Sequence, residues 1–415
     1  MSRTINIPKE AVFQSWKMVK ENQGSYGIDE QSISDFEADL SSHLYRVWNR
    51  LSSGSYYPPG VKGVDIPKRG GTRRLGVPTV ADRVAQGTIK VMFESRLEAL
   101  FDNDSYGYRP GRSCHDALEV TRRRCWQYSW VVEYDIRGLF DNISHDLLMK
   151  AVCRHFPETW VQMYIKRWLT APMVNPDGTI SVRETGTPQG GVLSPLLSNL
   201  FMHYATDLWM RREFPDLPWC RYADDGLIHC LSLKQAQMVR DKLARRLREV
   251  GLEIHPEKTH IVYCQDDCRR KCSDWPKTSF EFLGYEFTER LAQNRKTGHV
   301  FRRFLPAIGR NRLKELGDKL KKQPVLRAMF ALIDDVAQAL NPIIRGWYNY
   351  YGKFYLSRLQ ALSCYINERL IIWLKEKYRR SKKGGTKARA YRFLRKIFQS
   401  RPKLFYHWKY GFSTF

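Results

Sequence analysis

Hydrophobic side chains recur with helical spacing in several long stretches of the chain. In residues 34–51 they lie three or four positions apart, at Phe36, Leu40, Leu44, Val47 and Leu51. Ser34 and Glu37 form the Ser-x-x-Glu pattern of a capping box, so this stretch predicts an amphipathic helix. The same spacing predicts a helix over residues 234–250 and mostly helical structure over residues 304–378.

Shorter apolar stretches predict strands between these helices. Residues 61–77 have the pattern of a strand, a basic Gly-rich turn and a second strand. Residues 129–135 predict a buried strand that ends in the carboxylate of Asp135. An apolar-periodic helix follows, with Ser144 or Asn142 as its N-cap.

Two adjacent acids, Asp224 and Asp225, follow Tyr222 and Ala223 between apolar flanks. Asp-Gly between short apolar stretches is a hairpin-turn signal, so we expect a hairpin that projects both carboxylates from its tip. Neighbouring carboxylates repel, and divalent cations offset that repulsion. A solvated turn is the alternative for such a pair in isolation, and the second acidic position at the end of the predicted strand favours a metal site.

Charge is distributed unevenly along the 415 residues. The formal net charge is +26, and residues 301–415 hold 27 Lys and Arg against 6 Asp and Glu. From Lys377 onward there are thirteen Lys and Arg and no acid. This segregation points to a polyanionic partner, while the 12 Trp and 22 Tyr supply groups that can stack on bases.

The nine cysteines do not form a disulfide pattern, because their number is odd and most are scattered. With no apolar stretch near eighteen residues and no signal peptide pattern, we expect a reducing cytoplasm. Cys264, Cys268 and Cys272 lie near His260 in the sequence, and zinc binding is the alternative for this cluster. They lack paired Cys-x-x-Cys units, so we expect an exposed polar loop instead.

The acidic positions carry a family resemblance. Asp135 followed five residues later by Phe140, and then Tyr222-Ala-Asp-Asp225, resembles the palm of a reverse transcriptase. The most specific single motif is Gly-Thr-Pro-Gln-Gly-Gly-Val-Leu-Ser-Pro-Leu-Leu-Ser-Asn at 186–199. Its two glycines after the glutamine permit close backbone approach to a ligand, with a plain loop before the helix from Ser194 as the alternative.

The last third of the chain narrows the resemblance. Residues 344–354 are similar to the thumb, or maturase, domain of group II intron-encoded proteins, and residues 280–285 resemble the primer-contacting strand pair of the palm. The basic stretch that runs from Lys377 to Gly411 resembles the family's short DNA-binding segment. A Cys-x-x-Cys-bearing HNH endonuclease is not found in the sequence, so the resemblance is to the compact, class C-like branch.

The resemblance implies an α+β, right-hand polymerase fold with an antiparallel-sheet palm. The expected domains are an N-terminal helical extension (1–60), reverse transcriptase fingers and palm (61–290), a helical thumb or maturase X domain (291–378) and a basic DNA-binding segment (379–415).

The resemblance also implies a two-metal centre. Asp135 and Asp224 would be the main ligands of two Mg²⁺ ions, or of Mn²⁺, with the Ile136 carbonyl assisting. Asp225 completes the acidic set, either as a ligand or through its charge. Two such ions can stabilise both the attacking and the leaving oxygen in nucleotidyl transfer.

Further residues are implied to bind the incoming nucleotide. Lys68 and Arg73 would hold the triphosphate, because point and forked cations suit phosphate oxygens. Arg74 departs from the family, which usually has proline there.

Three residues are implied to act on the sugar, the base and the leaving group. Phe140 would lie under the sugar and exclude a 2′-hydroxyl, and Gln189 would touch the nucleotide or its template base. Lys258 lies at the position of a palm lysine that acts as general acid toward pyrophosphate; a solvated loop lysine is the alternative.

The function implied is that of an RNA-directed DNA polymerase encoded by a group II intron retroelement. It would copy intron RNA into cDNA and assist intron splicing and mobility, with intron RNA, target DNA and dNTPs as partners and no membrane. We expect a ribonucleoprotein in the bacterial cytoplasm, associated with the nucleoid. The alternatives are a free-standing reverse transcriptase in repair or defence, and a splicing maturase that acts mainly as an RNA binder.

Overall fold

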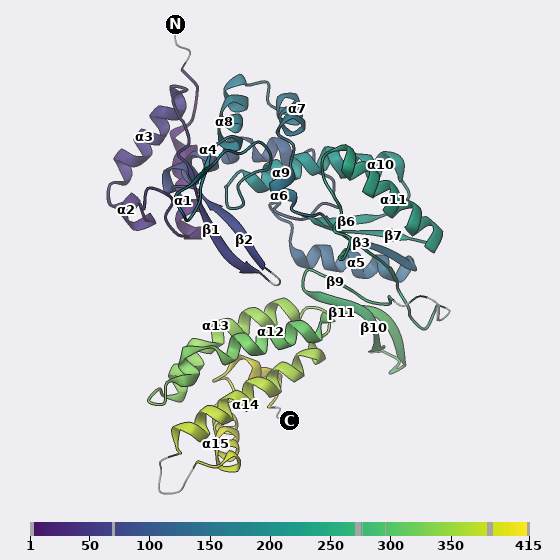
Figure 1. Cartoon of the computed structure of the whole chain (residues 1–415). Helices are drawn as coiled ribbons and strands as arrows, with labels where there is room; N and C mark the ends of the chain where they lie inside the picture. Colours follow the sequence, from purple (N-terminus) through teal and green to yellow (C-terminus); the bar gives the residue numbers. More distant parts are fainter. Residues whose placement is uncertain are drawn as a thin grey trace. The chain divides into compact units, whose positions relative to one another are not determined.

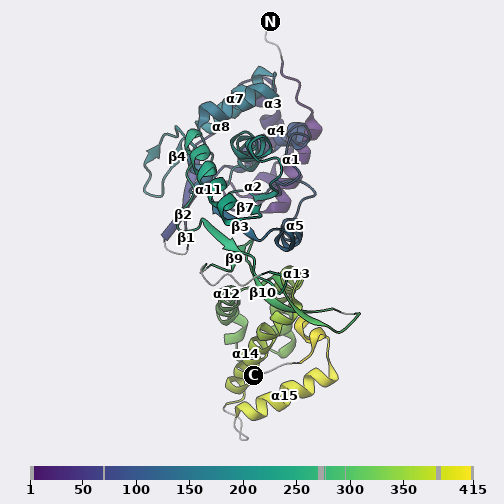
Figure 2. The same ribbon diagram turned by 90° about the vertical axis from the view of Figure 1, so that its right-hand side faces the viewer.

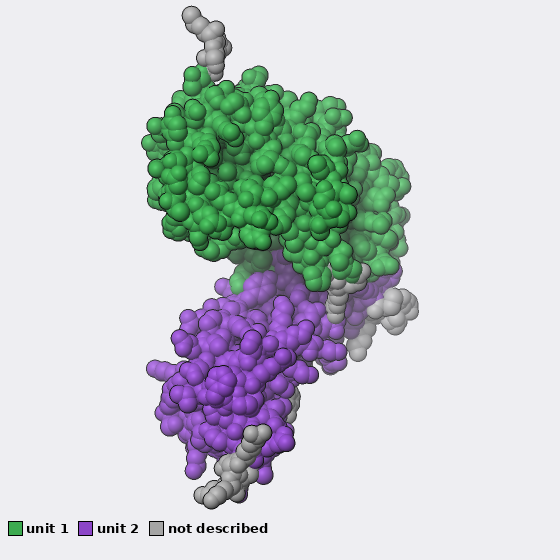
Figure 3. All heavy atoms as spheres, turned by 60° about the vertical axis from the view of Figure 1, so that its left-hand side comes forward, with its two compact units in different colours: residues 1–121, 130–261 green, residues 122–129, 262–415 purple. Residues whose placement is uncertain are grey.

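The chain folds into a mixture of helices and strands that divides into two compact units (Figures 1 and 3). Unit 1 comprises residues 1–121 and 130–261, and unit 2 comprises residues 122–129 and 262–415. The computed structural model describes residues 4–68, 71–269, 275, 277–294, 296–379 and 385–412, with only the backbone of Lys68. Each unit is treated by itself below, and the four predicted domains stay a prediction.

Unit 1 contains most of the helices. They are α1 (Lys9–Asn22), α2 (Ile33–Ala38), α3 (Leu40–Ser52), α4 (Val80–Glu98), α5 (Cys114–Gln127, its last residues counted with unit 2), α6 (Leu139–Asn142), α7 (His145–His155), α8 (Thr159–Leu169), α9 (Ser194–Met202), the π-helix η1 (His203–Asp207), α10 (Leu208–Glu213) and α11 (Leu233–Glu249). The expected N-cap of α7 is confirmed as Ser144, whose side chain accepts from the backbone N–H of Leu147.

The helix predicted over residues 34–51 is interrupted. Asp39 has non-helical backbone angles and separates α2 from α3. The capping box also lies earlier than predicted: Ser32 accepts from the backbone N–H of Asp35, and the Asp35 carboxylate accepts from that of Ser32. The predicted Ser34–Glu37 box is therefore wrong, because α2 begins at Ile33 and its capping box is formed two residues earlier by Ser32 and Asp35.

The predicted hairpin over residues 61–77 is confirmed. β1 (Val61–Lys68) and β2 (Gly71–Val77) pair antiparallel, with Lys62 opposite Val77. Two short strands, β4 (Met173–Val174) and β5 (Ile180–Ser181), complete a sheet of order β2-β1-β4-β5.

A second sheet carries the acidic motifs. Its order is β6-β7-β3-β8, formed by β3 (Trp130–Asp135), β6 (Trp219–Tyr222), β7 (Asp225–Cys230) and β8 (His260–Tyr263). β3 pairs antiparallel with β7, and Asp135 lies opposite Asp225. Helix α11 packs against β3 and β7, and Val132 and Ile228 between them are fully buried. The sheet thus brings both predicted acidic segments to one end.

The β6–β7 hairpin is confirmed, but its turn differs from the prediction. Ala223 and Asp224 form the turn, with Ala223 at φ 58°, and Asp225 already begins β7. Gly226 lies inside the strand opposite Tyr134. A Cβ at this glycine would lie 2.1 Å from the Tyr134 ring. The glycine is therefore explained by a ring that covers the strand and not by the turn.

A buried ion pair lies directly beneath this turn. The Arg221 guanidinium contacts the Asp207 carboxylate at 2.6 Å, and both side chains are about 1% exposed. Arg221 also donates to the Ala223 carbonyl at 3.3 Å and to the Ser105 hydroxyl at 2.9 Å. These bonds connect the turn to the buried end of η1 and to the segment before α5.

Unit 2 combines one sheet with a helical bundle. Its elements are β9 (Phe280–Phe282), β10 (Tyr285–Gln293), β11 (Val300–Ile308), α12 (Arg310–Lys321), η2 (Pro324–Arg327), α13 (Ile333–Tyr351), η3 (Leu356–Leu359), α14 (Gln360–Lys377), α15 (Lys387–Ser400) and η4 (Tyr406–Tyr410). The strands pair in the order β11-β10-β9, and Figure 2 shows the β10–β11 hairpin extending to one side of helices α12–α14. The mostly helical prediction for 304–378 is confirmed after β11.

The aromatic end of the basic segment is part of the core of unit 2. Phe405 and Trp408 are fully buried or nearly so. Asn367 on α14 accepts from the Trp408 indole at 2.9 Å and from His407 at 2.8 Å, and burial lowers the pKa of His407 to about 3. These rings hold the segment on the bundle, so they are not available for stacking on bases.

No helix among the described residues combines the length and the apolarity that crossing a bilayer requires.

Candidate functional site

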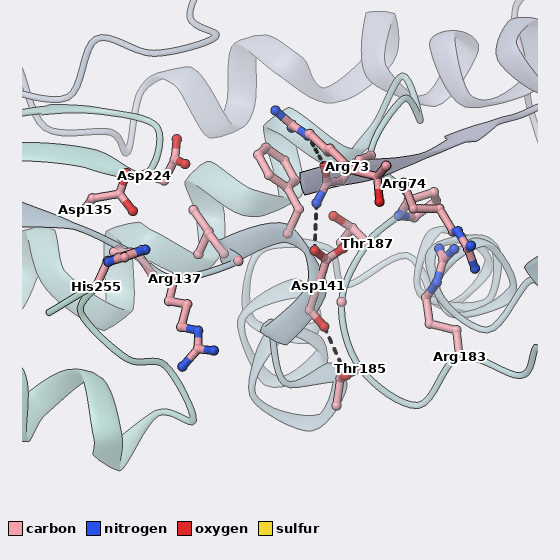
Figure 4. Close-up of a pocket in the computed structure, with 18 of the residues that line it drawn as sticks. Arg73, Arg74, Asp135, Arg137, Asp141, Arg183, Thr185, Thr187, Asp224 and His255 are labelled. Carbon is pink, nitrogen blue, oxygen red and sulfur yellow. Dashed lines mark hydrogen bonds between the residues drawn. The ribbon is translucent and has the colours of Figure 1, made fainter. Parts of the chain in front are cut away.

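A cavity of about 540 Å³ in unit 1 gathers most of the predicted site residues. Those that line it are Arg73, Asp135, Ile136, Phe140, Gln189, Asp224 and Lys258. Asp225 is not among the lining residues, and the side chain of Lys68 lies outside the described part of the chain. The close-up in Figure 4 shows Asp135 and Asp224 at one end of the cavity and Arg74 and Arg183 at the other.

The acidic end is built from the turn and the two strands beside it. The backbone N–H of Ile136 donates to the Asp224 carbonyl at 3.1 Å, which fixes the turn against the end of β3. Burial, with the charges of Asp224 and Asp135, raises the pKa of Asp225 to about 7. Burial, with the charge of Asp135, also raises the pKa of Asp224. The three carboxylates are thus close enough to repel one another.

This donor set has the chemistry that a divalent cation requires. It offers hard oxygen ligands whose mutual repulsion a cation would relieve. In the conformation described, however, no group of three or more His, Cys, Asp or Glu side chains among the described residues is arranged to hold a metal. The carboxylates fit the predicted ions by charge, and their assignment as ligands stays a prediction.

Lys258 lies at this acidic end. Its ammonium nitrogen is 2.7 Å from Oδ2 of Asp135, and its side chain is 48% exposed. The preceding loop is tied to the same strand end, because the backbone N–H of His255 donates to the Asp135 carbonyl at 2.7 Å. The lysine is therefore half-exposed and ion-paired to Asp135, and its role as a general acid stays a prediction.

Arg73 and Gln189 are joined in a chain of hydrogen bonds that ends on Asp141. The Nε of Arg73 donates to Oε1 of Gln189, and Nε2 of Gln189 donates to Oδ2 of Asp141 at 2.8 Å. The carboxylate fixes the orientation of the amide, since it can only accept. The amide oxygen in turn orients the guanidinium along the cavity.

The glycine-rich loop before α9 packs between β2 and α6. A Cβ at Gly190 would lie 2.4 Å from the Gly76 carbonyl, and a Cβ at Gly186 would lie 2.6 Å from the carbonyls of Phe140 and Asp141. Both glycines also have positive φ angles. Of the two glycines after Gln189, Gly190 thus approaches neighbouring backbone, and a Cβ at Gly191 would lie 2.6 Å from the Ser194 hydroxyl. Close approach of these glycines to a ligand stays a prediction.

Phe140 lies on the short helix α6 and packs against Tyr108. The ring centroids are 6.2 Å apart in an edge-to-face arrangement, and Phe140 is 8% exposed. Tyr108 has φ 58°, and burial with the charge of Asp224 raises the pKa of its hydroxyl. Phe140 lines the cavity, and Tyr108 packs against its ring without lining the cavity itself.

Several residues of the cavity were not expected from the sequence. Asp141, Arg137 and Arg183 line it together with His255. Asp141 had a local signal, because it directly follows Phe140 in the motif. The others lie in loops whose path depends on tertiary contacts.

Arg74, the departure from the family pattern, lines the basic end of the cavity and is bonded to neighbouring side chains there. Its guanidinium makes two contacts to Asp65, at 2.9 and 3.1 Å, and donates to Asn175 at 2.9 Å. It therefore braces β2 against β1 and the loop after β4.

Two family matches cover most of the chain. Residues 66–287 match the family described as "Reverse transcriptase (RNA-dependent DNA polymerase)". Residues 313–392 match the "Group II intron, maturase-specific domain". The first match includes every residue of the cavity described above.

Individual relatives agree with these matches. The group II intron-encoded protein LtrA of Lactococcus lactis subsp. cremoris is 35% identical over 346 residues, covering 67% of this chain and 56% of LtrA. Protein YkfC of Escherichia coli (strain K12) is 30% identical over 278 residues, covering 58% of this chain and 73% of YkfC. The chain thus spans little more than half the length of LtrA.

Among solved structures, telomerase from Candida albicans in complex with a TWJ fragment of telomeric RNA aligns with a TM-score of 0.48 and 13% identity, covering 89% of this chain and 66% of that one. A likeness of this size carries no argument about this chain. The two family matches and the identity to LtrA show that the chain belongs to the group II intron reverse transcriptase and maturase family.

Proposed function

We propose that the protein is an RNA-directed DNA polymerase encoded by a group II intron, which copies intron RNA into cDNA and assists intron splicing and mobility. The observation that carries this proposal is the cavity that joins Asp135 and Asp224 at one end to the Arg73–Gln189 pair. Metal-binding carboxylates and a phosphate-binding arginine in one cavity suit transfer of a nucleotide from a triphosphate.

The proposed right-hand fold assigns fingers and palm to elements of unit 1 and the thumb to elements of unit 2. The β1–β2 hairpin and α4 would be fingers, the β6-β7-β3-β8 sheet with α9 and α11 would be the palm, and helices α12–α14 would be the thumb. In this assignment the acids lie in the palm, and Arg73 reaches the same cavity from the fingers.

The sequence-predicted residues of the cavity each have a proposed task. Asp135 and Asp224, with the Ile136 carbonyl and Asp225, would hold divalent cations, whose charge stabilises the attacking and leaving oxygens when bound. Arg73, oriented by Gln189, would bind the triphosphate with its remaining N–H donors. These residues would align the α-phosphate with the primer end, which lowers the entropic part of the barrier.

Two further residues would act on the sugar and on the leaving group. Phe140, backed by Tyr108, would contact C2′ of the sugar and leave no room for a hydroxyl. Lys258 would give a proton to the departing pyrophosphate, since its ammonium already lies among the acids.

The proposed partners are intron RNA, target DNA and dNTPs. LtrA is an intron-encoded protein by its name, and unit 2 carries the maturase-specific match. Helix α15 adds Lys387, Arg389, Arg392, Arg395 and Lys396, and the described residues of this helix include no acid. Such a helix suits binding to phosphates with a steep salt dependence.

Primer extension on an RNA template with Mg²⁺ tests the proposal. Asp224→Asn should lower the extension rate at least about 10³-fold, because the change keeps the shape and removes the charge that holds the metal. Asp241→Asn is the matched control, since Asp241 is an exposed acid on α11 whose side chain is 63% exposed. Normal extension by Asp224→Asn, with an unchanged melting curve, would refute the assignment.

The main competing function is a maturase that only binds RNA. The raised pKa values of Asp224 and Asp225 argue against it, since a protein without metal chemistry has no use for repelling carboxylates. Splicing of a precursor RNA by Asp224→Asn separates the two activities: we expect splicing to continue while extension stops.

A further inference from the structure

A second cavity, of about 660 Å³, lies in unit 2 and has no part in the proposed polymerase site. Its walls come from the end of α5, the β10–β11 hairpin and the segment that leads into η3. The lining residues are Arg122, Trp126, Leu291, Ala292, Gln293, Phe301, Arg303, Leu305, Phe354, Tyr355, Leu356 and Ser357. All of them belong to unit 2. We call this cavity the arginine–aromatic groove.

Arginines and aromatic rings alternate in the groove. The Arg122 guanidinium lies 4.9 Å from the Trp126 ring centroid and 5.8 Å from that of Phe354. The Arg303 guanidinium lies 5.6 Å from the Trp126 ring and 5.9 Å from the Phe301 ring. A guanidinium that stacks on a ring keeps its N–H donors at the edge of its plane, where they can reach phosphate oxygens.

The groove is a built site and not a chance gap between side chains. The Trp126 indole donates to the Phe304 carbonyl at 3.0 Å, which fixes the central ring to β11. The Tyr355 hydroxyl donates to the Leu291 carbonyl at 2.8 Å, which fixes the start of η3 to β10. These bonds hold the rings in place before any ligand binds, so binding costs little ordering entropy.

The charge of the groove favours an anionic ligand. Among the described residues that line it, none is Asp or Glu. Arg303 has an acidic partner. The carboxylate of the buried Asp266 lies 3.6 Å from the guanidinium of Arg303 and 3.7 Å from that of Arg269. One carboxylate thus faces two guanidinium groups, and the three side chains together remain cationic.

The ligand must also be partly apolar. Leu291 is 58% exposed and Leu356 is 41% exposed at the rim, and Phe301, Phe354 and Tyr355 are partly exposed. Unpaired nucleobases joined by phosphates match rings between arginines, because bases stack on the rings while phosphates meet the guanidinium edges. A duplex has its bases stacked inside and can offer only phosphates, and an apolar peptide would bring no anionic group to the guanidinium edges.

We infer that the arginine–aromatic groove binds a single-stranded segment of RNA, with at least one base stacked on Phe301 or Tyr355. The inference rests on the proposed function for the choice of RNA, since an intron RNA partner has unpaired loops. It adds a binding site outside the template cavity, through which unit 2 would hold the RNA that the protein copies and splices.

Binding of a fluorescent 12-nucleotide oligouridylate to the full chain tests the inference. The protein is first saturated with an RNA-template, DNA-primer duplex, so that the polymerase cavity is filled. Phe301→Ala should weaken binding of the oligomer about tenfold, which is within the range for loss of one stacked base. Val300→Ala is the matched control, because Val300 precedes Phe301 on the same strand, is 54% exposed and does not line the groove.

The arginine is tested in the same way. Arg303→Gln should weaken binding and reduce the salt slope by about 0.7, the value for one phosphate contact to a single strand. Arg302→Gln is its control: this neighbour is 53% exposed, lies outside the groove and removes the same charge. Arg303→Lys keeps a cation beside Asp266, so it should fold normally and still bind weakly, because an ammonium lacks the flat guanidinium plane.

Further measurements decide the outcome. A 4-thiouridine oligomer should crosslink to residues 291–305 or 354–357. Equal binding by Phe301→Ala and Val300→Ala, crosslinks confined to other segments, or tighter binding of oligothymidylate or of an RNA duplex would each overturn the inference. Primer extension by the same preparations should be unaffected by the groove variants, so failure of the proposed polymerase function would be seen separately from failure of the groove.

Discussion

The ammonium of Lys258 and the carboxylate of Asp135 form an ion pair of 2.7 Å at the acidic end of the cavity. Next to this pair, the backbone N–H of His255, in the loop before Lys258, donates a hydrogen bond to the carbonyl of Asp135 at the end of β3. The ammonium of Lys258 thus offsets part of the repulsion between the carboxylates. A metal ion bound by Asp135 would have to share that carboxylate with the lysine.

Lys258→Ala is expected to separate metal binding from chemistry. Removing the ammonium frees Asp135, so the Mg²⁺ concentration for half-maximal extension should fall. Loss of a positioned acid should at the same time lower the single-turnover rate by about 10²–10⁴-fold. Glu257→Ala, in the same loop, is the control. An unchanged single-turnover rate would mean that the lysine only balances charge.

The raised pKa of Asp225 predicts how metal binding depends on pH. Below pH 7 the folded protein holds a proton on this carboxyl, whose pKa is about 7, and metal must displace it. The apparent Mg²⁺ affinity should therefore fall about tenfold for each pH unit below 7, if one proton is released. Titration of Mg²⁺ by calorimetry between pH 5.5 and 8, in buffers of different ionisation enthalpy, measures both the affinity and the proton.

The same group predicts the pH dependence of stability without metal. Its pKa is about 7 when folded and 3.8 in the unfolded reference, so the folded state binds more protons between these values. The free energy of unfolding should then decrease as pH rises from about 4 to above 7. Asp225→Asn should reduce this dependence, leaving the part due to Asp224, and stabilise the metal-free protein at pH 8 by up to about 4 kcal/mol. Urea unfolding in EDTA is the measurement, and a variant less stable than wild type at pH 8 would contradict it.

Phe140→Ala should admit ribonucleotides. The change opens space beneath the sugar, and one contact of this kind discriminates by about 10- to 200-fold. The ratio of kcat/KM for dATP over ATP should fall by that factor, while kcat/KM for dATP changes less. Phe13→Ala, at an exposed phenylalanine of α1, is the control. An unchanged ratio would remove Phe140 from sugar selection.

Gly186→Ala should disturb the glycine-rich loop before α9, and Gly178→Ala provides a matched comparison. Both glycines have positive φ, so both variants carry backbone strain of about 1–2 kcal/mol. At Gly178 no atom lies within 4 Å of the new Cβ, whereas at Gly186 two carbonyls lie 2.6 Å away. We expect Gly186→Ala to lose a further ~1–3 kcal/mol of stability and to raise KM for dNTPs. Equal losses in urea unfolding would show that only the φ angle matters.

Arg221→Leu should be strongly destabilising. It leaves Asp207 buried without its partner, which costs about 3–5 kcal/mol. The double change Arg221→Leu with Asp207→Leu should recover much of that loss. Arg240→Leu, which breaks an exposed pair with Asp241, should cost less than about 1 kcal/mol. If the single and double changes at the buried pair were equally destabilising, the unpaired charge would not be the cause.

Much of unit 1 could be predicted from local patterns. The β1–β2 hairpin, the β6–β7 hairpin and the N-cap at Ser144 depend on a few neighbouring residues, and all three are found. The capping box was misplaced because Ser32–Asp35 and Ser34–Glu37 have nearly the same pattern, and only tertiary packing distinguishes them.

Glycines and long-range polar contacts were less predictable. A glycine in a motif can serve a turn, a ligand or a neighbouring chain, and the sequence does not tell them apart. At Gly226 the neighbour is the Tyr134 ring, and at Gly190 it is the Gly76 carbonyl. The bond from Gln189 to Asp141 joins residues 48 positions apart. Such contacts depend on how separate segments meet, which local periodicity does not encode.

Helix α5 has a consequence for how this protein can be divided. Its first residues count with unit 1, and residues 122–129 count with unit 2 before the chain returns to unit 1 at Trp130. A single cut after residue 261 would therefore leave residues 122–129 with unit 1, and no single cut can yield unit 2 whole. A fragment that begins at residue 262 would lack Arg122 and Trp126, and with them one wall of the arginine–aromatic groove. Exchange of unit 2 between two such proteins would need three crossovers, because the chain passes between the units after residues 121, 129 and 261. Otherwise the recipient would have to supply a compatible α5.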